Sequence, residues 1–542
     1  MKTAHIPDIS TCQISRNRNC QELLLFLLFV QTIMNDTHNT GSSRIARNTL
    51  MLYIRMLVLL LVGLYTSRVV LSALGESDYG VYNVIGGVVA MFTIISGALN
   101  SAVSRFITFE MGKGESAQLD KVYSTAVTIQ IILAAIVVIV AEPAGLWFIE
   151  NEMTIDPSRI PAAKWVLQFS LAAFVINLMS VPQMASITAH EKMSAYAAIG
   201  LLDGFLRLGV AVMVSRSDCD RLVLYAALMA AVVLCVRMAY GFYCRRNFTE
   251  CRYRPVFDRP LIREMFSFAG WNFIGVTSSV LRDHGGNILV NLFSGPAVNA
   301  ARGLAVQLNG AIQGFVTNFM TAVNPQITKS YAGGEHEYMF SLMRKSSSMS
   351  FYLLFVLSLP VLFNTEFILA LWLKDVPEHS VLFVRLFLIF ALSEAFSNPL
   401  ITAQLATGRI RNYQLLVGGL QLLNLPVSYM LLKNGAMPET TVVVATVISQ
   451  ICLFARLFML RRMIGFPVRK YLLRVYFRAL ATAAASAMVF LPIYAVLPDS
   501  TAGILTGIVM CLLMTSAAIY LIGLNRDEKD MIAAFITKAT GR

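Results

Sequence analysis

Charged side chains are scarce in this 542-residue sequence. Asp, Glu, Lys and Arg make up 14% of it, whereas 56% of its residues are hydrophobic. Soluble globular chains are usually about 25% charged and about 45–50% apolar. So few charges cannot cover a water-facing surface of this size, which excludes a soluble multidomain protein. We therefore expect lipid to be the main solvent of the folded chain.

The sequence also lacks the patterns that hold disulfides, metals or nucleotides. Its eight cysteines form no CxxC pair and no Cys/His cluster, and several lie inside apolar runs, where a free cysteine behaves as a small hydrophobic residue. Neither a GxxxxGKS/T loop nor a GxGxxG loop in its required context is present, so this chain is not expected to use ATP. No metal or organic cofactor is expected.

Long apolar runs dominate what the sequence does contain. A transmembrane helix needs ~20 mostly apolar residues, and this length predicts an all-α polytopic membrane protein with about fourteen transmembrane helices. The expected spans lie near residues 48–73, 80–102, 122–148, 163–188, 195–215, 221–243, 265–290, 297–323, 346–373, 380–405, 411–433, 438–460, 472–497 and 501–524.

The gaps between these runs alternate in charge, and this alternation predicts the orientation. The net charge of +13 comes from Lys and Arg in every second gap, while the other gaps are short and often acidic. Such a distribution favours membrane topology over nucleic-acid binding, because basic loops are retained in the cytoplasm. We expect both termini in the cytoplasm, an even number of spans, and membrane lipids as partners.

The order of spans and basic gaps suggests six parts. We interpret residues 1–43 as a cytoplasmic tail or a start-site artefact, with Met34 as the true start. Residues 44–243 and 265–460 form two six-helix halves joined by a basic linker, 244–264. Residues 461–524 add two helices, and 525–542 form a cytoplasmic tail. Each half opens alike, with a span ending at Leu74-Gly75 or at Ser294-Gly295-Pro296. Paired halves are common in transporters, with the substrate site between them.

Two arginines lie inside the first span. Arg55 is about two turns from its cytoplasmic end and Arg68 about two turns from its outer end. An ionisable group at mid-helix costs roughly 2.5–3.5 kcal/mol, so such residues usually face a protein interior or an aqueous cavity. Both arginines either reach the membrane surface with their long side chains or line a cationic cavity that binds substrate.

The seventh span carries the densest group of ionisable residues, Arg282-Asp283-His284, followed by Gly285-Gly286-Asn287. One interpretation is an internal Arg–Asp pair that only fixes helix packing. The other assigns Arg282 and Asn287 to substrate binding and Asp283 to coupling by a proton or cation. The two glycines would permit bending or a close approach of helices.

Two further carboxylates are candidate coupling sites. Asp203 and Arg207 are four residues apart on one helix and can pair there, which is a structural alternative to a role for Asp203. Glu394 lies near mid-membrane, one turn before Asn398-Pro399, and is either hydrogen-bonded within the bundle or a proton site. Arg456 is nearer a span end, where we expect its side chain to reach the membrane surface.

The opening spans resemble those of a known group of proteins. The similar segments are Asn48-Thr49-Leu50, Tyr65-Thr66-Ser67-Arg68, Leu74-Gly75-Glu76-Ser77-Asp78-Tyr79-Gly80-Val81-Tyr82-Asn83-Val84 and Ser104-Arg105-Phe106. Their sequence is similar to that of bacterial polysaccharide and O-antigen flippases. These belong to the multidrug/oligosaccharidyl-lipid/polysaccharide exporter superfamily.

This resemblance implies a fold and a function. It implies two six-helix lobes around a central cavity that opens alternately to the two sides, and a substrate oligosaccharide linked through pyrophosphate to a polyprenyl carrier. Arg55, Arg68 and Arg282 would hold the pyrophosphate, H⁺ or Na⁺ would serve as a coupling ion, and a polysaccharide polymerase complex would be a further partner. The alternatives are a multidrug antiporter of the same superfamily, a membrane-embedded polymerase or ligase, and an assembly scaffold.

Overall fold

The computed structural model describes residues 41–114, 116–153, 155–255, 258–373, 375–496, 500–525 and 529. Its contacts divide the chain into Met1–Ala46 and Arg47–Arg542. Of the first unit, only Gly41–Ala46 are described, and they are helical. Residues 1–40, with Met34, and nearly all of the expected tail 525–542 lie outside the described residues. The division into six parts therefore stays a prediction.

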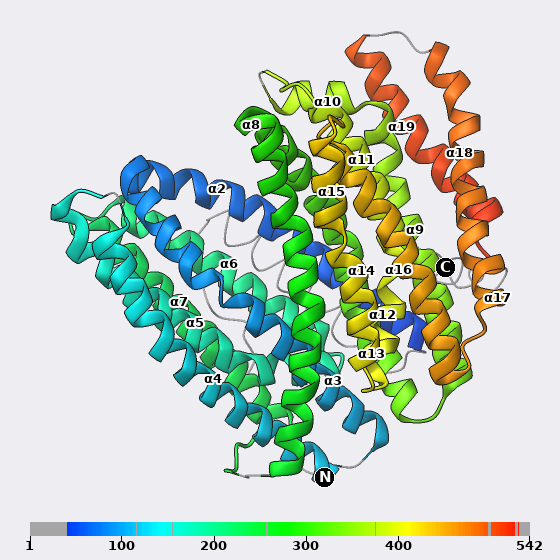
Figure 1. Ribbon diagram of the computed structural model, residues 1–542. Helices are drawn as coiled ribbons and strands as arrows, with labels where there is room; N and C mark the ends of the chain where they lie inside the picture. Colours follow the sequence, from blue (N-terminus) through cyan, green and yellow to red (C-terminus); the bar gives the residue numbers. More distant parts are fainter. Residues whose placement is uncertain are drawn as a thin grey trace, which may run out of the picture. The chain divides into compact units, whose positions relative to one another are not determined.

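Every regular element in the described ranges is helical, which confirms the all-α membrane fold (Figure 1). The α-helices are α2 (Gly41–Ala90), α3 (Thr93–Lys113), α4 (Ser116–Asn151), α5 (Ile160–Ala189), α6 (Met193–Ser215), α7 (Arg221–Asn247), α8 (Arg259–Ala332), α9 (His336–Phe363), α10 (Thr365–Trp372), α11 (Ser380–Ala395), α12 (Asn398–Ala406), α13 (Arg411–Tyr413), α14 (Gly419–Leu422), α15 (Asn424–Lys433), α16 (Thr440–Ile464), α17 (Val468–Tyr471), α18 (Phe477–Val496) and α19 (Thr501–Ala518). Short π-helical turns at Gln414–Gly418, Leu472–Tyr476 and Ile519–Gly523 continue three of them.

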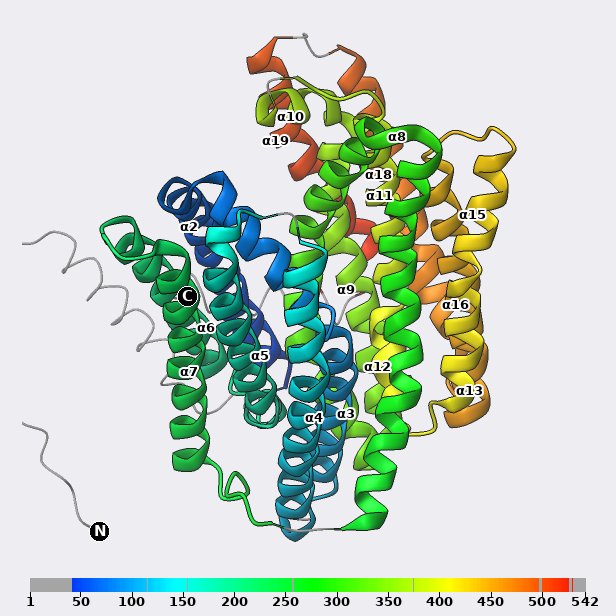
Figure 2. The same ribbon diagram turned by 60° about the vertical axis from the view of Figure 1, so that its left-hand side comes forward.

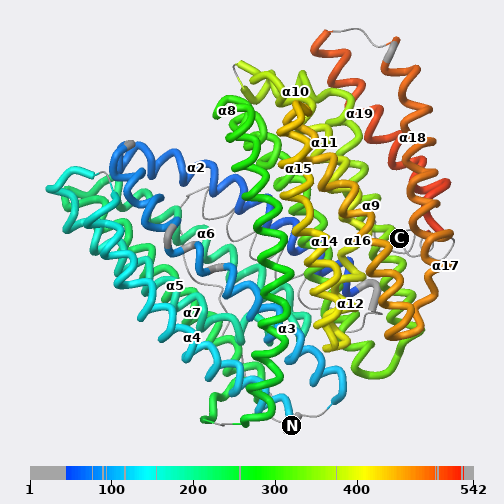
Figure 3. Tube along the Cα trace, viewed as in Figure 1, coloured from blue at the N-terminus to red at the C-terminus, as the bar shows by residue number. Residues whose placement is uncertain are grey.

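The two longest helices are each interrupted by a single glycine. Gly75 in α2 has φ 76° and ψ 169°, and Gly295 in α8, the green helix in Figure 3, has φ 81° and ψ 175°. This region of backbone space is essentially restricted to glycine. The loops expected at these two positions are thus reduced to one residue each. In both halves of the chain, the first long helix is interrupted by a glycine in the same backbone conformation.

In α8 the glycine makes a hairpin. The Arg302 guanidinium donates hydrogen bonds to the side-chain oxygen of Asn287 and to the backbone oxygen of Asp283. In an uninterrupted helix, residues 15 apart are separated by about 22 Å, so the two arms of α8 must lie against each other. The expected spans 265–290 and 297–323 are these two arms.

Eleven helices in the described ranges are long and apolar enough to cross a membrane. The expected spans 80–102, 265–290 and 297–323 are not among them. The first is interrupted between Ala90 and Thr93, and the other two carry polar and charged residues along the α8 arms. The multi-pass membrane character is confirmed, and the count of fourteen stays a prediction.

One expected span is misplaced by about ten residues. We expected 346–373, but α9 runs from His336 to Phe363 and ends at Asn364, whose amide donates to the Pro360 carbonyl at 3.0 Å. The serine-rich start of α9 looks too polar for a span, yet Ser346, Ser347 and Ser350 are buried against other helices. Polar residues usually mark the end of a span that faces lipid, but these serines are buried inside the protein, so their polarity does not mark a helix end.

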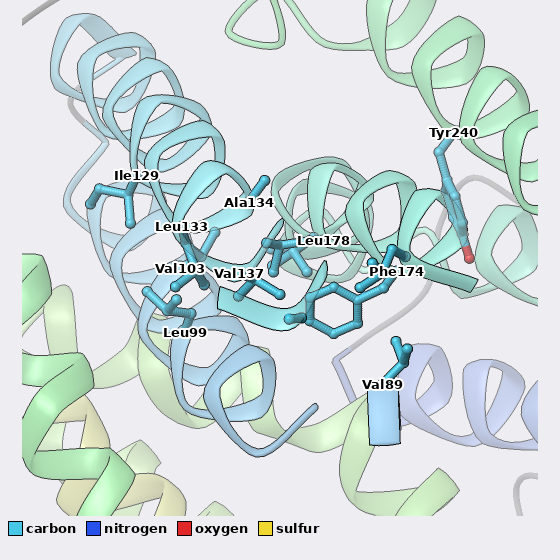
Figure 4. Close-up of a cluster of buried hydrophobic side chains, with 14 of the residues drawn as sticks. Val89, Leu99, Val103, Ile129, Leu133, Ala134, Val137, Phe174, Leu178 and Tyr240 are labelled. Carbon is cyan, nitrogen blue, oxygen red and sulfur yellow. The ribbon is translucent and has the colours of Figure 1, made fainter. Parts of the chain in front are cut away.

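The described core of the first half joins α3, α4 and α5. Val103 from α3, Ile129 and Val137 from α4, and Leu178 from α5 are all buried in one apolar cluster (Figure 4). Small and β-branched side chains allow these helices to approach closely, as in other membrane bundles. This packing positions the helices that carry the polar residues described below.

The second half is a bundle of α8, α9, α11, α12 and α16, with α15 packed beside α16 (Figures 1 and 2). The last helices attach to α9. The Tyr471 hydroxyl donates to the Ser347 hydroxyl of α9 at 3.1 Å, and the Tyr352 hydroxyl of α9 donates to the Gly523 carbonyl at 3.1 Å. Residues after Ile464 therefore pack against the second half and do not separate the two halves.

Replacing either hinge glycine should destabilise the protein. Gly75→Ala and Gly295→Ala place a Cβ in a backbone region that costs about 1–3 kcal/mol for other residues, so each should lower the unfolding temperature in detergent. The matched controls are Gly63→Ala and Gly303→Ala, where a Cβ meets nothing within 4 Å. These should be neutral or slightly stabilising, because alanine favours helix by about 1 kcal/mol. Equal effects at hinge and control positions would contradict the assigned role of the hinges.

Candidate substrate cavity

A cavity of about 490 Å³ lies among the helices of the first half. We call it the first-half cavity. Its polar lining comes from α2, α3, α5, α6 and α7: Arg55, Ser96, Asn100, Asn177, Ser180, Tyr196, Asp203, Arg207 and Tyr240. Two of these residues, Arg55 and Asp203, were predicted as site residues from the sequence, and the fold places both in the same cavity.

Arg55 packs against an aromatic ring. Its guanidinium carbon lies 4.5 Å from the centre of the Tyr196 ring, a cation–π contact. Its Nε atom is buried with no hydrogen-bond partner among the described residues. Gly200 provides the space, because a Cβ there would lie 2.4 Å from Nε. The side chain thus keeps an unused donor beside a polar cavity.

Asp203 and Arg207 form the pair expected from their spacing. The Arg207 Nε donates to an Asp203 carboxylate oxygen at 2.9 Å, and both side chains also line the cavity. This arrangement satisfies the carboxylate without removing it from the cavity wall. The sequence-based choice between a structural pair and a coupling site stays open.

A second cavity, of about 310 Å³, lies between the two halves, and we call it the inter-half cavity. It shares Asn100, Met184 and Tyr196 with the first-half cavity. Most of its other lining is hydroxyl and amide groups: Ser101, Ser104, Thr108, Thr188, Thr321, Asn324, Thr328 and Thr402. Such groups exchange hydrogen bonds readily with sugar hydroxyls, and Arg105 adds one positive charge.

The second half has a smaller cavity, of about 120 Å³, which we call the second-half cavity. Arg282, Glu394 and Asn398 line it, together with Gln313, Thr317 and Phe390. The Arg282 guanidinium lies 5.0 Å from the Phe390 ring centre and donates to an Asp283 carboxylate oxygen at 2.9 Å. Glu394 accepts a hydrogen bond from the Ser449 hydroxyl. The fold therefore brings Arg282 and Glu394 together, while the exposed Asp283 is not part of this lining.

Arg302 was missed as a site candidate. Only 5% of it is exposed, and besides its two bonds across the α8 hairpin it lies 5.3 Å from the Phe387 ring centre. It holds Asn287, which lines none of the cavities described here. The rule applied to Arg282, that an arginine inside a span faces the protein, would have found it.

The structure also shows where Arg456 and Arg68 lie. Arg456 was expected to reach the membrane surface, yet it is 1% exposed and donates to the Ser397 hydroxyl at 2.9 Å and towards the Tyr413 hydroxyl at 3.4 Å. Arg68 is exposed and lines none of the cavities described here. Tertiary packing, rather than depth in the span, decided the position of Arg456.

Arginines outnumber carboxylates in the lining of the first-half cavity, which has Arg55 and Arg207 against Asp203. The lining of the second-half cavity is balanced, with Arg282 against Glu394. The first-half cavity therefore retains one surplus positive charge, in a low-dielectric setting where charge is felt strongly. The arrangement therefore favours an anionic ligand over a cationic one.

The two halves meet at the basic ends of their helices. Lys329 of α8 pairs with Glu191 at 2.9 Å, and the Gln326 amide donates to the same carboxylate at 3.1 Å. His190 stacks beside this pair on Phe248, with ring centres 3.9 Å apart, and burial lowers the pKa of its imidazole. The contact between the halves at this end is made by the Glu191–Lys329 charge pair and the Gln326 hydrogen bond.

Comparison with known proteins places these features in context. The sequence profile of a family described as "Polysaccharide biosynthesis protein" matches residues 45–331, more than half of the chain. No curated protein matches the sequence.

Solved structures share the fold. A multidrug resistance MATE family transporter of the MOP superfamily, in an outward-facing conformation, has 12% identity and a TM-score of 0.67, covering 80% of this chain and 100% of its own. A MOP superfamily transporter from Pyrococcus furiosus Vc1 has 12% identity and a TM-score of 0.66, covering 80% and 99%. For that protein, reverse polarity of the binding pocket suggests a different function. A MATE structure in complex with MaD3S has 14% identity and a TM-score of 0.67, covering 81% and 99%. At these identities the likeness is one of fold.

Removing Arg302 should weaken the hairpin of α8. Arg302→Leu leaves the Asn287 side-chain oxygen and the Asp283 carbonyl without their donor, which should cost about 1–3 kcal/mol. We expect a lower unfolding temperature of the purified protein in detergent. Arg462→Leu, at an exposed position on the last turn of α16, is the control and should unfold like the wild type. An unchanged unfolding temperature for Arg302→Leu would refute the structural role.

Proposed function

The chain belongs to the polysaccharide biosynthesis protein family, and on that premise we propose that it moves a polyprenyl-pyrophosphate-linked oligosaccharide across the bacterial inner membrane. The product would supply O-antigen, capsule or exopolysaccharide assembly. Its multi-pass helical fold is that of MOP and MATE transporters rather than of an enzyme, so the activity we propose is transport without covalent chemistry. We place both termini in the cytoplasm, as the basic gaps predict.

The surplus of arginines carries this proposal. A pyrophosphate needs cations in a cavity of low dielectric constant, and the planar guanidinium matches phosphate oxygens with a fork of donors. Arg55 has a buried donor without a partner, and Arg282 stands at the wall of the second-half cavity. The hydroxyl and amide lining of the inter-half cavity suits the sugars. A cationic drug, the rival substrate, would meet surplus positive charge in the first-half cavity and at Arg105 in the inter-half cavity.

We propose alternating access as the mechanism. In the present arrangement the halves are tied at their basic, cytoplasmic ends by the Glu191–Lys329 pair and by the bond from Arg105 to the Ala406 carbonyl, at 3.2 Å. Release of these contacts would admit the head group from the cytoplasm, and their return would accompany release on the far side. The polyprenyl tail would remain in lipid.

We propose that the carrier is reset by H⁺ or Na⁺ at one of the cavity carboxylates. Glu394 and Asp203 are the stronger candidates, because each lines a cavity beside an arginine, whereas Asp283 is exposed and lines neither. Neutralising a carboxylate frees its arginine partner for the phosphate, which links ion binding to substrate binding. A polysaccharide polymerase complex would receive the product.

The first test asks which leaflet holds the lipid-linked oligosaccharide. In spheroplasts lacking the protein, a membrane-impermeant sugar-modifying probe should fail to label it, because it accumulates in the inner leaflet. Wild-type protein should restore labelling, and Arg55→Gln or Arg282→Gln should not, at equal membrane levels. Arg246→Gln, an exposed residue at the end of α7, is the control. Full labelling without the protein would reject the function, and a drug-sensitivity panel would then test the multidrug alternative.

A second test moves Arg55 without removing its charge. Gly200→Val puts side-chain atoms where the Arg55 guanidinium lies, since even a Cβ would come within 2.4 Å of Nε. We expect outer-leaflet labelling to fall by at least about tenfold, the effect of about 1.4 kcal/mol of lost binding. Gly209→Val, on the same helix but with nothing within 4 Å of its Cβ, should transport normally. Equal transport by both variants would show that the position of Arg55 is unimportant.

A further inference from the structure

A further cavity, of about 910 Å³, opens at the basic end of the protein. We call it the arginine vestibule. It is formed by the start of α8, the end of α3 and the segment that leads into α13, all at the lower end of the molecule in Figure 1. Four exposed arginines line it: Arg259, Arg263, Arg409 and Arg411.

The charge of the vestibule suits a multiply charged anion. Glu264 is the carboxylate in its lining, against four guanidinium groups. Its wall is also aromatic: Trp271 lines it, and the Arg411 guanidinium carbon lies 5.4 Å from that ring centre. A space of this size lies within the range of about 300–1,000 Å³ typical of ligand sites. The vestibule is thus large enough for a phosphorylated head group and too large for a single ion.

Arg105 separates the vestibule from the inter-half cavity. Its side chain lines the inter-half cavity, and its guanidinium carbon lies 4.6 Å from the ring centre of Phe106 and 5.8 Å from that of Phe268, two rings that line the vestibule. Gly408, also in the vestibule wall, has φ +72° and sits so close that a Cβ would be 2.7 Å from an Arg105 nitrogen. One side chain therefore forms the partition between the two spaces.

The partition is held from both halves of the chain. Arg105 belongs to α3 in the first half, and its terminal nitrogen donates to the Ala406 carbonyl, at the end of α12 in the second half, at 3.2 Å. Its Nε is buried without a hydrogen-bond partner among the described residues. Movement of one half relative to the other would break the Ala406 contact and swing a guanidinium from one cavity towards the other.

We propose that the arginine vestibule is the loading site for the diphosphate of a membrane lipid, and that Arg105 is the gate through which this group passes to the inter-half cavity. This inference rests on the proposed function and adds to it a binding step at the cytoplasmic surface. Basic clusters at that surface attract anionic lipid head groups, and guanidinium groups bind phosphate oxygens through paired, charge-assisted hydrogen bonds. From the vestibule the diphosphate moves past Arg105 and then reaches Arg55 through the lining shared at Asn100 and Tyr196.

The test measures lipid binding to the purified full-length protein. The probes are a polyprenyl diphosphate, phosphatidylglycerol and inorganic pyrophosphate. The double variant Arg263→Gln/Arg409→Gln should bind the polyprenyl diphosphate at least about tenfold more weakly, because two charge-assisted contacts are lost. Arg263→Lys/Arg409→Lys keeps the charge and should recover part of this loss. The control Arg245→Gln/Arg246→Gln removes two exposed arginines elsewhere on the basic side and should bind normally.

Three results would overturn the vestibule assignment. Unchanged binding of the polyprenyl diphosphate to the double variant would do so. An equal loss for phosphatidylglycerol would identify a general site for anionic lipid, and a loss confined to inorganic pyrophosphate would identify a site for the free anion. If wild-type protein binds no polyprenyl diphosphate, the proposed function itself fails. If Arg55→Gln weakens binding and the double variant does not, only the vestibule fails.

The gate has a separate readout. Arg105→Gln should retain binding of the polyprenyl diphosphate within about twofold, because all four vestibule arginines remain, and should lose outer-leaflet labelling of the oligosaccharide. Normal labelling by Arg105→Gln would refute the gate. Loss of lipid binding by this variant would also refute it, by showing that Arg105 belongs to the binding site.

Discussion

Guanidinium groups inside an apolar bundle are the constraint around which this structure is organised. Each one needs acceptors or an aromatic face, because lipid and hydrocarbon side chains offer neither. Arg302 and Arg456 are bound by carbonyl, amide and hydroxyl oxygens, while Arg55 rests on Tyr196. The groups that satisfy these arginines come from different helices, so meeting the need of each charge also fixes how the helices pack. The polar cavities follow from this arrangement.

The two hinge glycines give the halves a common opening. Gly75 and Gly295 have nearly the same backbone angles, with φ of 76° and 81°, and each turns a long helix where only glycine is tolerated. At Gly295 the turn brings Arg302 back onto Asn287. A ligand site that needs charge from both halves can be built in this way without long loops, which lipid would not tolerate.

The cavities form a series from the basic end inward. The arginine vestibule borders Arg105, Arg105 borders the inter-half cavity, and that cavity shares Asn100 and Tyr196 with the space around Arg55. Positive charge occurs at each stage, with hydroxyl and amide groups between. An anionic group linked to a sugar would find a suitable surface throughout, whereas a cation would be opposed at every step.

The sequence by itself determined the all-helical membrane fold and the alternation of basic and acidic gaps, and it marked Arg55 and Arg282 as charges inside spans. Those conclusions follow from composition and local pattern, which depend on transfer from water to lipid. Tertiary structure alone decided which charges meet. It buried Arg456, paired Arg302 with Asn287, left Arg68 exposed and set Arg105 against Ala406. These contacts join residues distant in sequence, and no local pattern records the turn of a hairpin or the packing of one half on the other.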